Sequence, residues 1–174
     1  GYGDYFDGSW DGKDHADEGQ KRVDGQVLWH HPGVPYIMPT DSFLQYIQQK
    51  HVKRAIDAGI DAIYLEEPEF FMVAGYSESF KREWKKFYGF DWRAAHESPA
   101  NTYLSNKLKY ELYYKALKEV FAFAKQYGKT KGMNVRCYVP THSLVNYALW
   151  GIVSPESGLA SLEELDGYIA QVWT

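Results

Sequence analysis

The sequence predicts an α/β fold built on a parallel sheet, with helices crossing over between successive strands. Short apolar runs that suit buried strands alternate with longer segments whose apolar residues recur every three to four positions, as on one helix face. Helix-start and helix-stop residues separate these segments. The 174 residues are enough for a buried core, so we expect one domain over residues 1–174.

Residues 1–36 are expected to form a long loop region rich in aromatic and acidic residues. Glycine and aspartate are frequent there, and no hydrophobic period is sustained. Long loops in compact domains are often functional, and aromatic rings stack on the apolar faces of sugar rings. We therefore take Asp4 and Trp10 as candidate sugar contacts. The alternative is a flexible end that packs on nothing.

Four helices follow from capping residues and apolar stripes. A helix over 40–58 begins at Thr40 or Asp41, and Gly59 ends it. Ser98 followed by Pro99 is a strong start signal for a long third helix that we expect to end near residue 127, before Gly128. The other helices are expected over 77–88, ended by Gly89, and over 143–150, with a helical turn over 161–165.

Three strands are expected over residues 61–65, 134–139 and 167–173, with one or two more near 27–29 and 36–38. Pro68 and Pro140 should end the first and second of these strands, because proline cannot donate to a strand ladder. A doubly wound sheet and a (β/α)8 barrel both fit this order. No glycine-rich phosphate loop follows a strand, which disfavours a nucleotide-binding sheet.

Composition excludes several classes of function. The net charge is −4 with no basic stripe, which argues against a nucleic-acid partner, and no apolar run reaches the roughly 20 residues of a membrane span. A single cysteine, Cys137, excludes an internal disulfide and a cysteine-rich zinc site. Aromatic residues make up 17% of the chain, which favours a carbohydrate partner. No signal segment is visible, so we expect a cytoplasmic protein. We also expect no cofactor.

Candidate site residues stand at the predicted carboxyl ends of the strands, where active sites of parallel α/β folds gather. These residues are Glu66, Glu67, Glu69, Tyr138, His142 and Trp173. Adjacent carboxylates repel each other and lose hydration when buried, and both effects raise a carboxyl pKa. A raised pKa suits a general acid, so we expect Glu66 or Glu67 to project into the site.

A resemblance rests on Tyr64-Leu65-Glu66-Glu67-Pro68 and on the aromatic-rich segment 76–89, which ends in Tyr-Gly. Residues 36–92 resemble clan-A (β/α)8 glycoside hydrolases, most closely the family 42 β-galactosidase-type enzymes. In that pattern strand 4 ends in Asn-Glu, and the resemblance implies that Glu67 is the general acid/base. The chain has Glu66 where the family has Asn, which implies a substrate other than a simple β-galactoside.

The resemblance also implies that the chain is a partial barrel, covering about strand 3 to strand 6. A complete barrel needs about 250 residues. The family's nucleophile is a glutamate at the end of strand 7, so we expect the nucleophile to lie outside this chain. The partner that completes the site would then be the rest of its own barrel or another subunit.

The leading hypothesis is a retaining glycoside hydrolase acting on a β-linked glycoside, with Glu67 as general acid/base. Glu66, Tyr138, His142 and Trp173 would then line the sugar subsite. A second hypothesis is a non-catalytic carbohydrate-binding barrel. A third is a divalent-metal-dependent barrel isomerase or lyase that uses the cluster Glu66, Glu67, Glu69 and His142.

Overall fold

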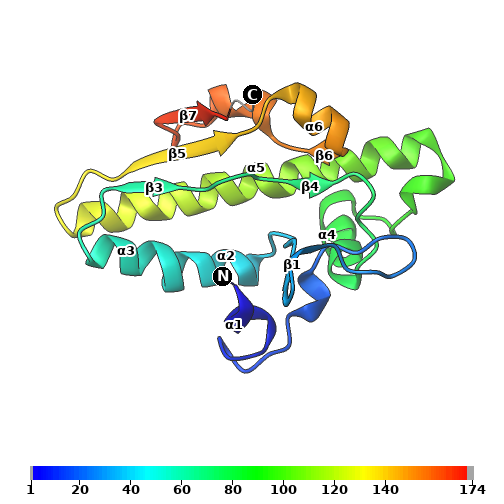
Figure 1. The fold of residues 1–174 in the computed structure, drawn as a ribbon, viewed down its shortest axis with the longest axis horizontal. Coiled ribbons are helices and arrows are strands. Elements are labelled where there is room, and N and C mark those ends of the chain that lie inside the picture. Colours follow the sequence, from blue (N-terminus) through cyan, green and yellow to red (C-terminus); the bar gives the residue numbers. More distant parts are fainter. Residues whose placement is uncertain (1, 172–174) are drawn as a thin grey trace.

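The computed structural model describes residues 2–171, and Figure 1 shows their arrangement. The helices are α1 (Gly3–Phe6), η1 (Ala16–Glu18), α2 (Asp41–Tyr46), the π-helical η2 (Ile47–Val52), α3 (Lys53–Asp57), α4 (Glu78–Tyr88), η3 (Ala95–Glu97), α5 (Pro99–Thr130), α6 (Leu144–Trp150) and η4 (Glu156–Ser161). The strands are β1 (Trp29–His31), β2 (Val34–Pro35), β3 (Ala62–Tyr64), β4 (Phe70–Phe71), β5 (Arg136–Thr141), β6 (Ile152–Val153) and β7 (Gly167–Ala170).

The chain forms a parallel sheet in the order β3-β5-β7, as the alternation of helices and strands predicts. Tyr64 pairs with Tyr138, and Tyr138 pairs with Gly167. Helices α4 and α5 connect β3 to β5, and α6 lies between β5 and β7. Two small antiparallel pairs, β1–β2 and β4–β6, flank this sheet. Within residues 2–171 the sheet is not closed into a barrel, so the partial (β/α)8 barrel stays a prediction.

The core forms where the long helix α5 packs against one face of the sheet, with the α2–η2–α3 helix beside it (Figure 1). Its buried side chains include Ile56, Ile63, Leu117, Val120, Phe121, Cys137 and Val139. Each such aliphatic or aromatic side chain stabilises the fold by roughly 1.5–3 kcal/mol through burial. None of the helices in the described part of the chain is long and apolar enough to cross a membrane.

The predicted helix starts are confirmed by capping hydrogen bonds. The hydroxyls of Thr40, Ser77 and Ser98 each accept a hydrogen bond from a backbone N–H three residues later, which satisfies one of the free donors of the first turn. Gly89 ends α4 in the left-handed conformation, with φ of 76°. The local stop and start signals were therefore sufficient for these helix boundaries.

Two predicted boundaries are wrong because tertiary contacts override local signals. Helix α5 continues through Gly128 to Thr130, and a Cβ at Gly128 would meet Val135 Cγ2 at 2.4 Å, so glycine serves close packing there rather than a stop. Strand β5 continues through Pro140 to Thr141, because the Pro140 carbonyl still accepts a hydrogen bond from the Glu67 N–H.

The later part of the chain differs from prediction in detail. The expected helical turn over 161–165 lies earlier, as the 3-10 helix η4. Strand β7 covers Gly167–Ala170, and the Gln171 N–H extends the ladder by donating to the Thr141 carbonyl. The end of the predicted strand, with Trp173, lies outside the described residues.

Residues 2–36 pack on the rest of the molecule, so the alternative of a loose end is wrong for this part of the chain. The segment contains α1, η1 and the pair β1–β2, although loops connect them as expected. Tyr5 is completely buried against α2, and His15, Glu18 and Gln20 are also buried. Of these residues, Gln20 contacts the segment that follows β3, because its amide donates to the Glu69 carbonyl.

Candidate functional site

The carboxyl ends of β3 and β5 bring three ionisable side chains together. Backbone pairing continues beyond β3, since the N–H groups of Leu65 and Glu67 donate to the carbonyls of Tyr138 and Pro140. The segment that follows β3 therefore runs alongside the end of β5. This pairing places Glu67 and Glu69 next to His142, the residue that follows β5.

These three side chains, which we call the strand-end triad, are in direct contact. His142 Nε2 lies 2.6 Å from Glu67 Oε1 and 3.7 Å from Glu69 Oε1. The side chains of His142 and Glu69 are 6% and 8% exposed, whereas that of Glu67 is 33% exposed. The Trp150 ring lies edge-on to the imidazole, with 4.9 Å between ring centroids. The triad thus has a buried inner side and an open side at Glu67.

The raised carboxyl pKa in this cluster belongs to Glu69. Burial, and then the negative charge of Glu67, raise the pKa of Glu69 to about 7. Among the described residues no hydrogen-bond donor reaches Glu69 Oε1. Glu66, the other half of the doublet, is exposed and accepts a hydrogen bond from the Gln171 side chain at 3.0 Å. The sequence pattern therefore identified the cluster but not which carboxyl is buried.

Glu67 is held in an uncommon backbone conformation. Its φ is 52°, the only positive φ of a non-glycine residue in residues 2–171. The following residue is Pro68, whose ring favours extended backbone at the residue before it. Such conformations cost about 1–3 kcal/mol and concentrate at functional sites. The residue with this conformation is the one whose carboxylate contacts His142.

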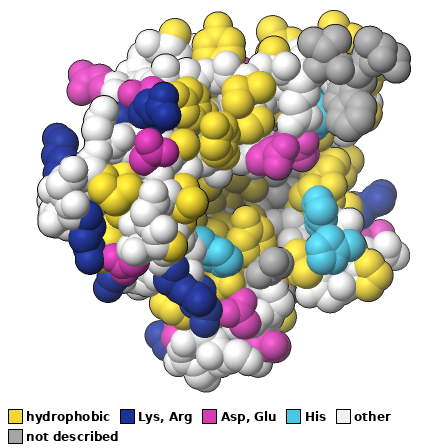
Figure 2. All heavy atoms as spheres, turned by 60° about the vertical axis from the view of Figure 1, so that its left-hand side comes forward, with side chains coloured by type: hydrophobic (Ala, Val, Ile, Leu, Met, Phe, Trp, Pro, Cys, Tyr) yellow, Lys and Arg dark blue, Asp and Glu magenta, His cyan; other side chains and the backbone are white. Residues whose placement is uncertain are grey.

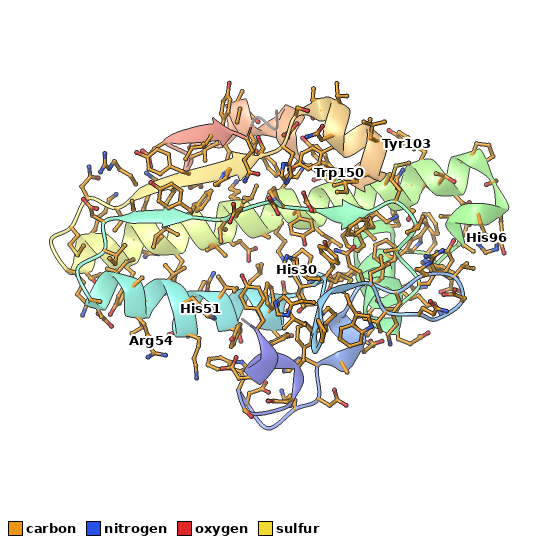
Figure 3. The ribbon with its side chains drawn as sticks, in the orientation of Figure 1. His30, His51, Arg54, His96, Tyr103 and Trp150 are labelled. Atoms are coloured by element: carbon orange, nitrogen blue, oxygen red, sulfur yellow. The ribbon has the colours of Figure 1, made fainter. Side chains whose placement is uncertain are left out.

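A cavity of about 480 Å³ adjoins the triad, within the usual size range of small-molecule sites. Glu66, Glu67 and Glu69 lie on one wall, and apolar side chains of α2, η2 and α5 form another. Figure 2 shows a hollowed face with hydrophobic side chains inside and acidic and histidine side chains around it. His30 from β1 and His51 from η2, labelled in Figure 3, also line the cavity. Tyr2 and Tyr36 supply aromatic rings to the lining.

The other predicted sugar contacts lie away from this cavity. Tyr138 stacks on Tyr64 within the sheet, with 5.3 Å between ring centroids. Asp4 accepts a hydrogen bond from the Tyr46 hydroxyl, and Trp10 lies edge-on to the same Tyr46 ring. Asp4, Trp10 and Tyr138 are not among the cavity-lining residues, because packing against α2 and within the sheet occupies them.

Gln20 supports the site, and sequence reasoning did not find it. Its amide Nε2 donates to the carbonyls of Glu69 and Ile37, and its Oε1 accepts from the Phe71 N–H. The side chain is 1% exposed. It therefore ties the segment that carries Glu69 to the N-terminal region. A single glutamine in a polar loop carries no pattern that would indicate this role.

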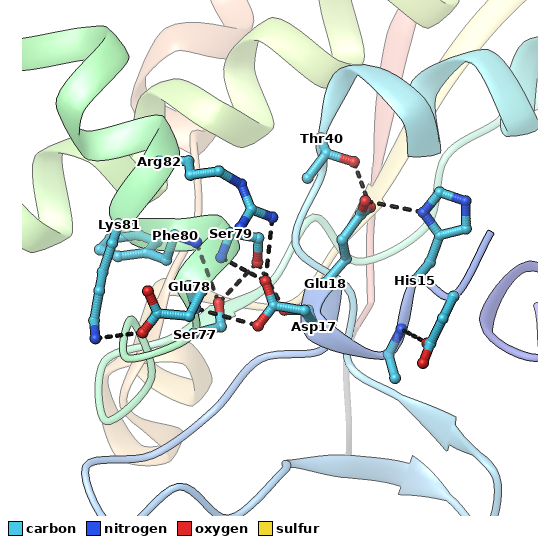
Figure 4. A network of polar contacts seen from close by, with 12 residues as sticks. His15, Asp17, Glu18, Thr40, Ser77, Glu78, Ser79, Phe80, Lys81 and Arg82 are labelled. Atoms are coloured by element: carbon cyan, nitrogen blue, oxygen red, sulfur yellow. Dashed lines mark hydrogen bonds and ion pairs between the residues drawn. The ribbon is translucent and has the colours of Figure 1, made fainter.

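A second buried histidine–carboxylate group lies in the N-terminal region, and we call it the N-terminal cluster (Figure 4). His15 Nδ1 lies 3.0 Å from Glu18 Oε1, and His15 Nε2 lies 3.0 Å from Asp11 Oδ1. Glu18 also accepts hydrogen bonds from the hydroxyls of Tyr5 and Thr40. Neighbouring Asp17 accepts hydrogen bonds from backbone N–H groups at the start of α4, so this region holds the start of α4 against the N-terminal region.

Comparison with protein-family models, curated proteins and solved structures found no match to this chain. Function must therefore be argued from the site itself. The strand-end triad offers a half-exposed carboxylate and a second carboxyl with a raised pKa, which both line the cavity, and an imidazole that contacts the first carboxylate. This arrangement suits proton transfer to a bound ligand, and it also matches the donor set of a divalent metal ion.

Proposed function

We propose that the protein is a retaining glycoside hydrolase that acts on a β-linked glycoside, with Glu67 as its general acid/base. The observation that carries the proposal is the position of the Glu67 carboxylate. It stands beyond the carboxyl end of a parallel strand, partly exposed to a cavity and in contact with a buried imidazole. Active-site groups of parallel α/β folds gather at this edge of the sheet.

The triad supports proton transfer by Glu67. In a retaining mechanism the acid/base first protonates the leaving oxygen and later takes a proton from water. The contact with His142 at 2.6 Å orients the Glu67 carboxyl, while its open side faces the cavity. Glu69 is buried beside Glu67, and burial and the negative charge of Glu67 raise the pKa of Glu69 to about 7, so the triad can hold a proton on Glu69 near neutral pH.

The nucleophile belongs, in this proposal, to a residue outside these 174. A retaining pair flanks the scissile bond with carboxyls about 5–5.5 Å apart. Glu69 does not suit that role, because it lies two residues from Glu67 in the same segment and is buried against His142. The proposal accordingly includes a partial (β/α)8 barrel that the rest of its own barrel or another subunit completes, in the cytoplasm.

The cavity supports a carbohydrate as the substrate. Its lining combines carboxylates, which accept hydrogen bonds from hydroxyls, with aromatic and apolar side chains that suit the CH faces of a sugar ring. Glu66 is exposed and lines the cavity, and in this proposal it accepts a hydrogen bond from a sugar hydroxyl. His142 lies behind Glu67, and we assign it the positioning of that carboxyl.

Activity of the intact protein on a panel of β-glycosides tests the proposal. We expect Glu67→Gln to lose nearly all turnover of unactivated glycosides, and to retain more on aryl glycosides whose leaving group needs no protonation. Glu78→Gln is the matched control, because Glu78 is an exposed carboxylate on α4 that pairs with Lys81. Equal turnover of unactivated glycosides by wild type and Glu67→Gln would refute the assignment.

A further inference from the structure

We propose that Glu67, Glu69 and His142 form a binding site for a divalent transition-metal ion of the Zn²⁺ type. The proposal goes beyond the glycosidase assignment and does not depend on it. One donor atom from each side chain, a carboxylate oxygen or an imidazole nitrogen, lies within 4.8 Å of the other two. All three side chains converge from two neighbouring strand ends, so the backbone pairing of β3 and β5 holds the donor set together.

The second observation is the state of Glu69. Its side chain is 8% exposed, and no hydrogen-bond donor reaches Oε1 in residues 2–171. That oxygen faces the middle of the triad, 3.7 Å from His142 Nε2. Buried carboxylate oxygens are normally hydrogen-bonded or bound to a cation, because burial removes their hydration. A metal ion within the triad would satisfy this oxygen.

The distances between the donor atoms fit a coordinated metal ion once the Glu67 side chain rotates. Ligand atoms about 2.0–2.2 Å from a tetrahedral Zn²⁺ lie about 3.3–3.6 Å from each other. The distance between His142 Nε2 and Glu69 Oε1 is 3.7 Å, close to that range, and the distance to Glu67 Oε1 is 2.6 Å. Rotation of the half-exposed Glu67 side chain away from His142 would open the second distance. The buried pair Glu69 and His142 therefore forms the rigid part of the site.

The donor set selects the class of metal. Imidazole suits zinc and neighbouring transition metals, whereas Mg²⁺ and Ca²⁺ prefer oxygen ligands alone. Three protein ligands leave the fourth position of a tetrahedral ion open. Glu67 and Glu69 both line the cavity, so we infer that a ligand would reach this position from the cavity.

Two other groups of histidine residues are alternatives to the triad as metal-binding sites. His30 and His31 are adjacent and exposed on β1, without a carboxylate partner in their own strand. In the N-terminal cluster, both ring nitrogens of His15 and the Glu18 carboxylate already have partners. Neither group combines a buried imidazole with an unsatisfied carboxylate oxygen, so the triad is the preferred site.

Metal binding would compete with proton transfer. A Glu67 carboxylate that coordinates a cation cannot carry the proton that a leaving oxygen needs. If the proposed glycosidase function also holds, Zn²⁺ should inhibit turnover, and a chelator should restore it. This inhibition rests on both proposals, whereas binding of the metal is measured without substrate and tests the site alone.

Calorimetric titration of the chelator-treated full chain with ZnCl₂ tests the proposal. We expect one tight site, weakened at least tenfold in Glu69→Gln and in His142→Asn, since loss of even a supporting residue costs about 10–100-fold in metal affinity. The double variant His30→Asn/His31→Asn is the control and should bind as wild type does. Titration with Co²⁺ adds a second readout, because a visible absorption band should appear in wild type and not in His142→Asn.

Unchanged affinity in both triad variants, or loss of binding in the His30/His31 control alone, would overturn the proposal. Glu69→Gln keeps the shape of the side chain, and circular dichroism checks that each variant is folded. Anomalous diffraction from zinc-soaked crystals of the unaltered protein covers the case in which the variants do not fold. A peak between the three side chains supports the site, and peaks only elsewhere contradict it.

Discussion

The strand-end triad and the N-terminal cluster are built from the same residue types but differ in how their polar atoms are satisfied. In the N-terminal cluster both nitrogens of His15 have carboxylate partners, and Glu18 accepts hydrogen bonds from Tyr5 and Thr40 as well. In the triad, Glu69 Oε1 has no donor within residues 2–171, and the neighbouring Glu67 faces a cavity. A cluster whose polar atoms all have hydrogen-bond partners stabilises the fold. A cluster beside a cavity that has a polar atom without such a partner is suited to binding a ligand.

The largest effect on stability is expected when the N-terminal cluster loses its central carboxylate. Glu18→Ala leaves His15, Tyr5 and Thr40 without their shared acceptor, so we expect a loss of about 3 kcal/mol in the free energy of unfolding. Urea denaturation followed by circular dichroism measures it. A loss under about 0.5 kcal/mol, the range of neutral surface substitutions, would show that the cluster is not structural.

Lys109 extends the comparison to a buried amine. Its side chain is fully buried, and its Nζ donates to the Met72 carbonyl and to Asn106, both neutral acceptors. Burial lowers the pKa of Lys109 to about 7. The unfolded chain therefore binds the extra proton between pH 7 and the ordinary lysine value, so raising the pH through this window stabilises the folded state.

The variant Lys109→Met tests this effect. We expect the free energy of unfolding of wild type to rise by on the order of 2 kcal/mol between pH 7 and pH 9.5, and the rise to be absent in the variant. Exposed Lys85, which pairs with Asp91 on the surface, supplies the control substitution Lys85→Met. A parallel rise in wild type and Lys109→Met would contradict the role of the buried amine.

The strained backbone at Glu67 predicts an effect of intermediate size with an unusual sign. Replacement of alanine by glycine normally destabilises a protein, but at φ of 52° glycine avoids the clash of a Cβ. We expect Glu67→Gly to be more stable than Glu67→Ala by about 1 kcal/mol. Thermal unfolding of the two variants makes the comparison, since both lack the carboxylate. A less stable glycine variant would argue against strain at this position.

The smallest effect is expected for Glu69→Gln. Because Oε1 has no donor and Glu67 repels the Glu69 charge, an amide removes an unfavourable interaction rather than a favourable one. We expect the free energy of unfolding at pH 8 to change by less than about 0.5 kcal/mol or to increase. Glu18→Gln provides the contrast, with a clear loss. Equal losses in the two variants would remove the distinction between the two groups.

Much of the fold was predictable from local signals. The serines before α4 and α5, Thr40 before α2 and Gly89 after α4 act through hydrogen bonds and φ angles within one helical turn. The strand over 61–65 and its carboxyl-end glutamates were identified in the same way, as was His142 after β5. Parallel pairing then follows from the alternation of helices and strands, which explains why Glu67 and His142 could be predicted to share one edge.

Other features depended on residues far apart in the chain. Gly128 lies inside α5, where the close packing of Val135 requires a glycine, and the N-terminal region packs on α2 through contacts that no local pattern reveals. The same reasoning that identified the glutamates did not indicate that Glu69 would be the buried one, or that Asp4 and Trp10 would pack against Tyr46.

The sequence by itself determined which elements form and which ionisable residues stand at the strand ends, because capping, strand propensity and the two-residue alternation act over a few positions. Only the tertiary structure decided which of those groups are buried, satisfied or open to a cavity. Burial and hydrogen-bond saturation depend on what distant segments such as Gln20 place against the site, and these properties set the chemistry of Glu67, Glu69 and His142.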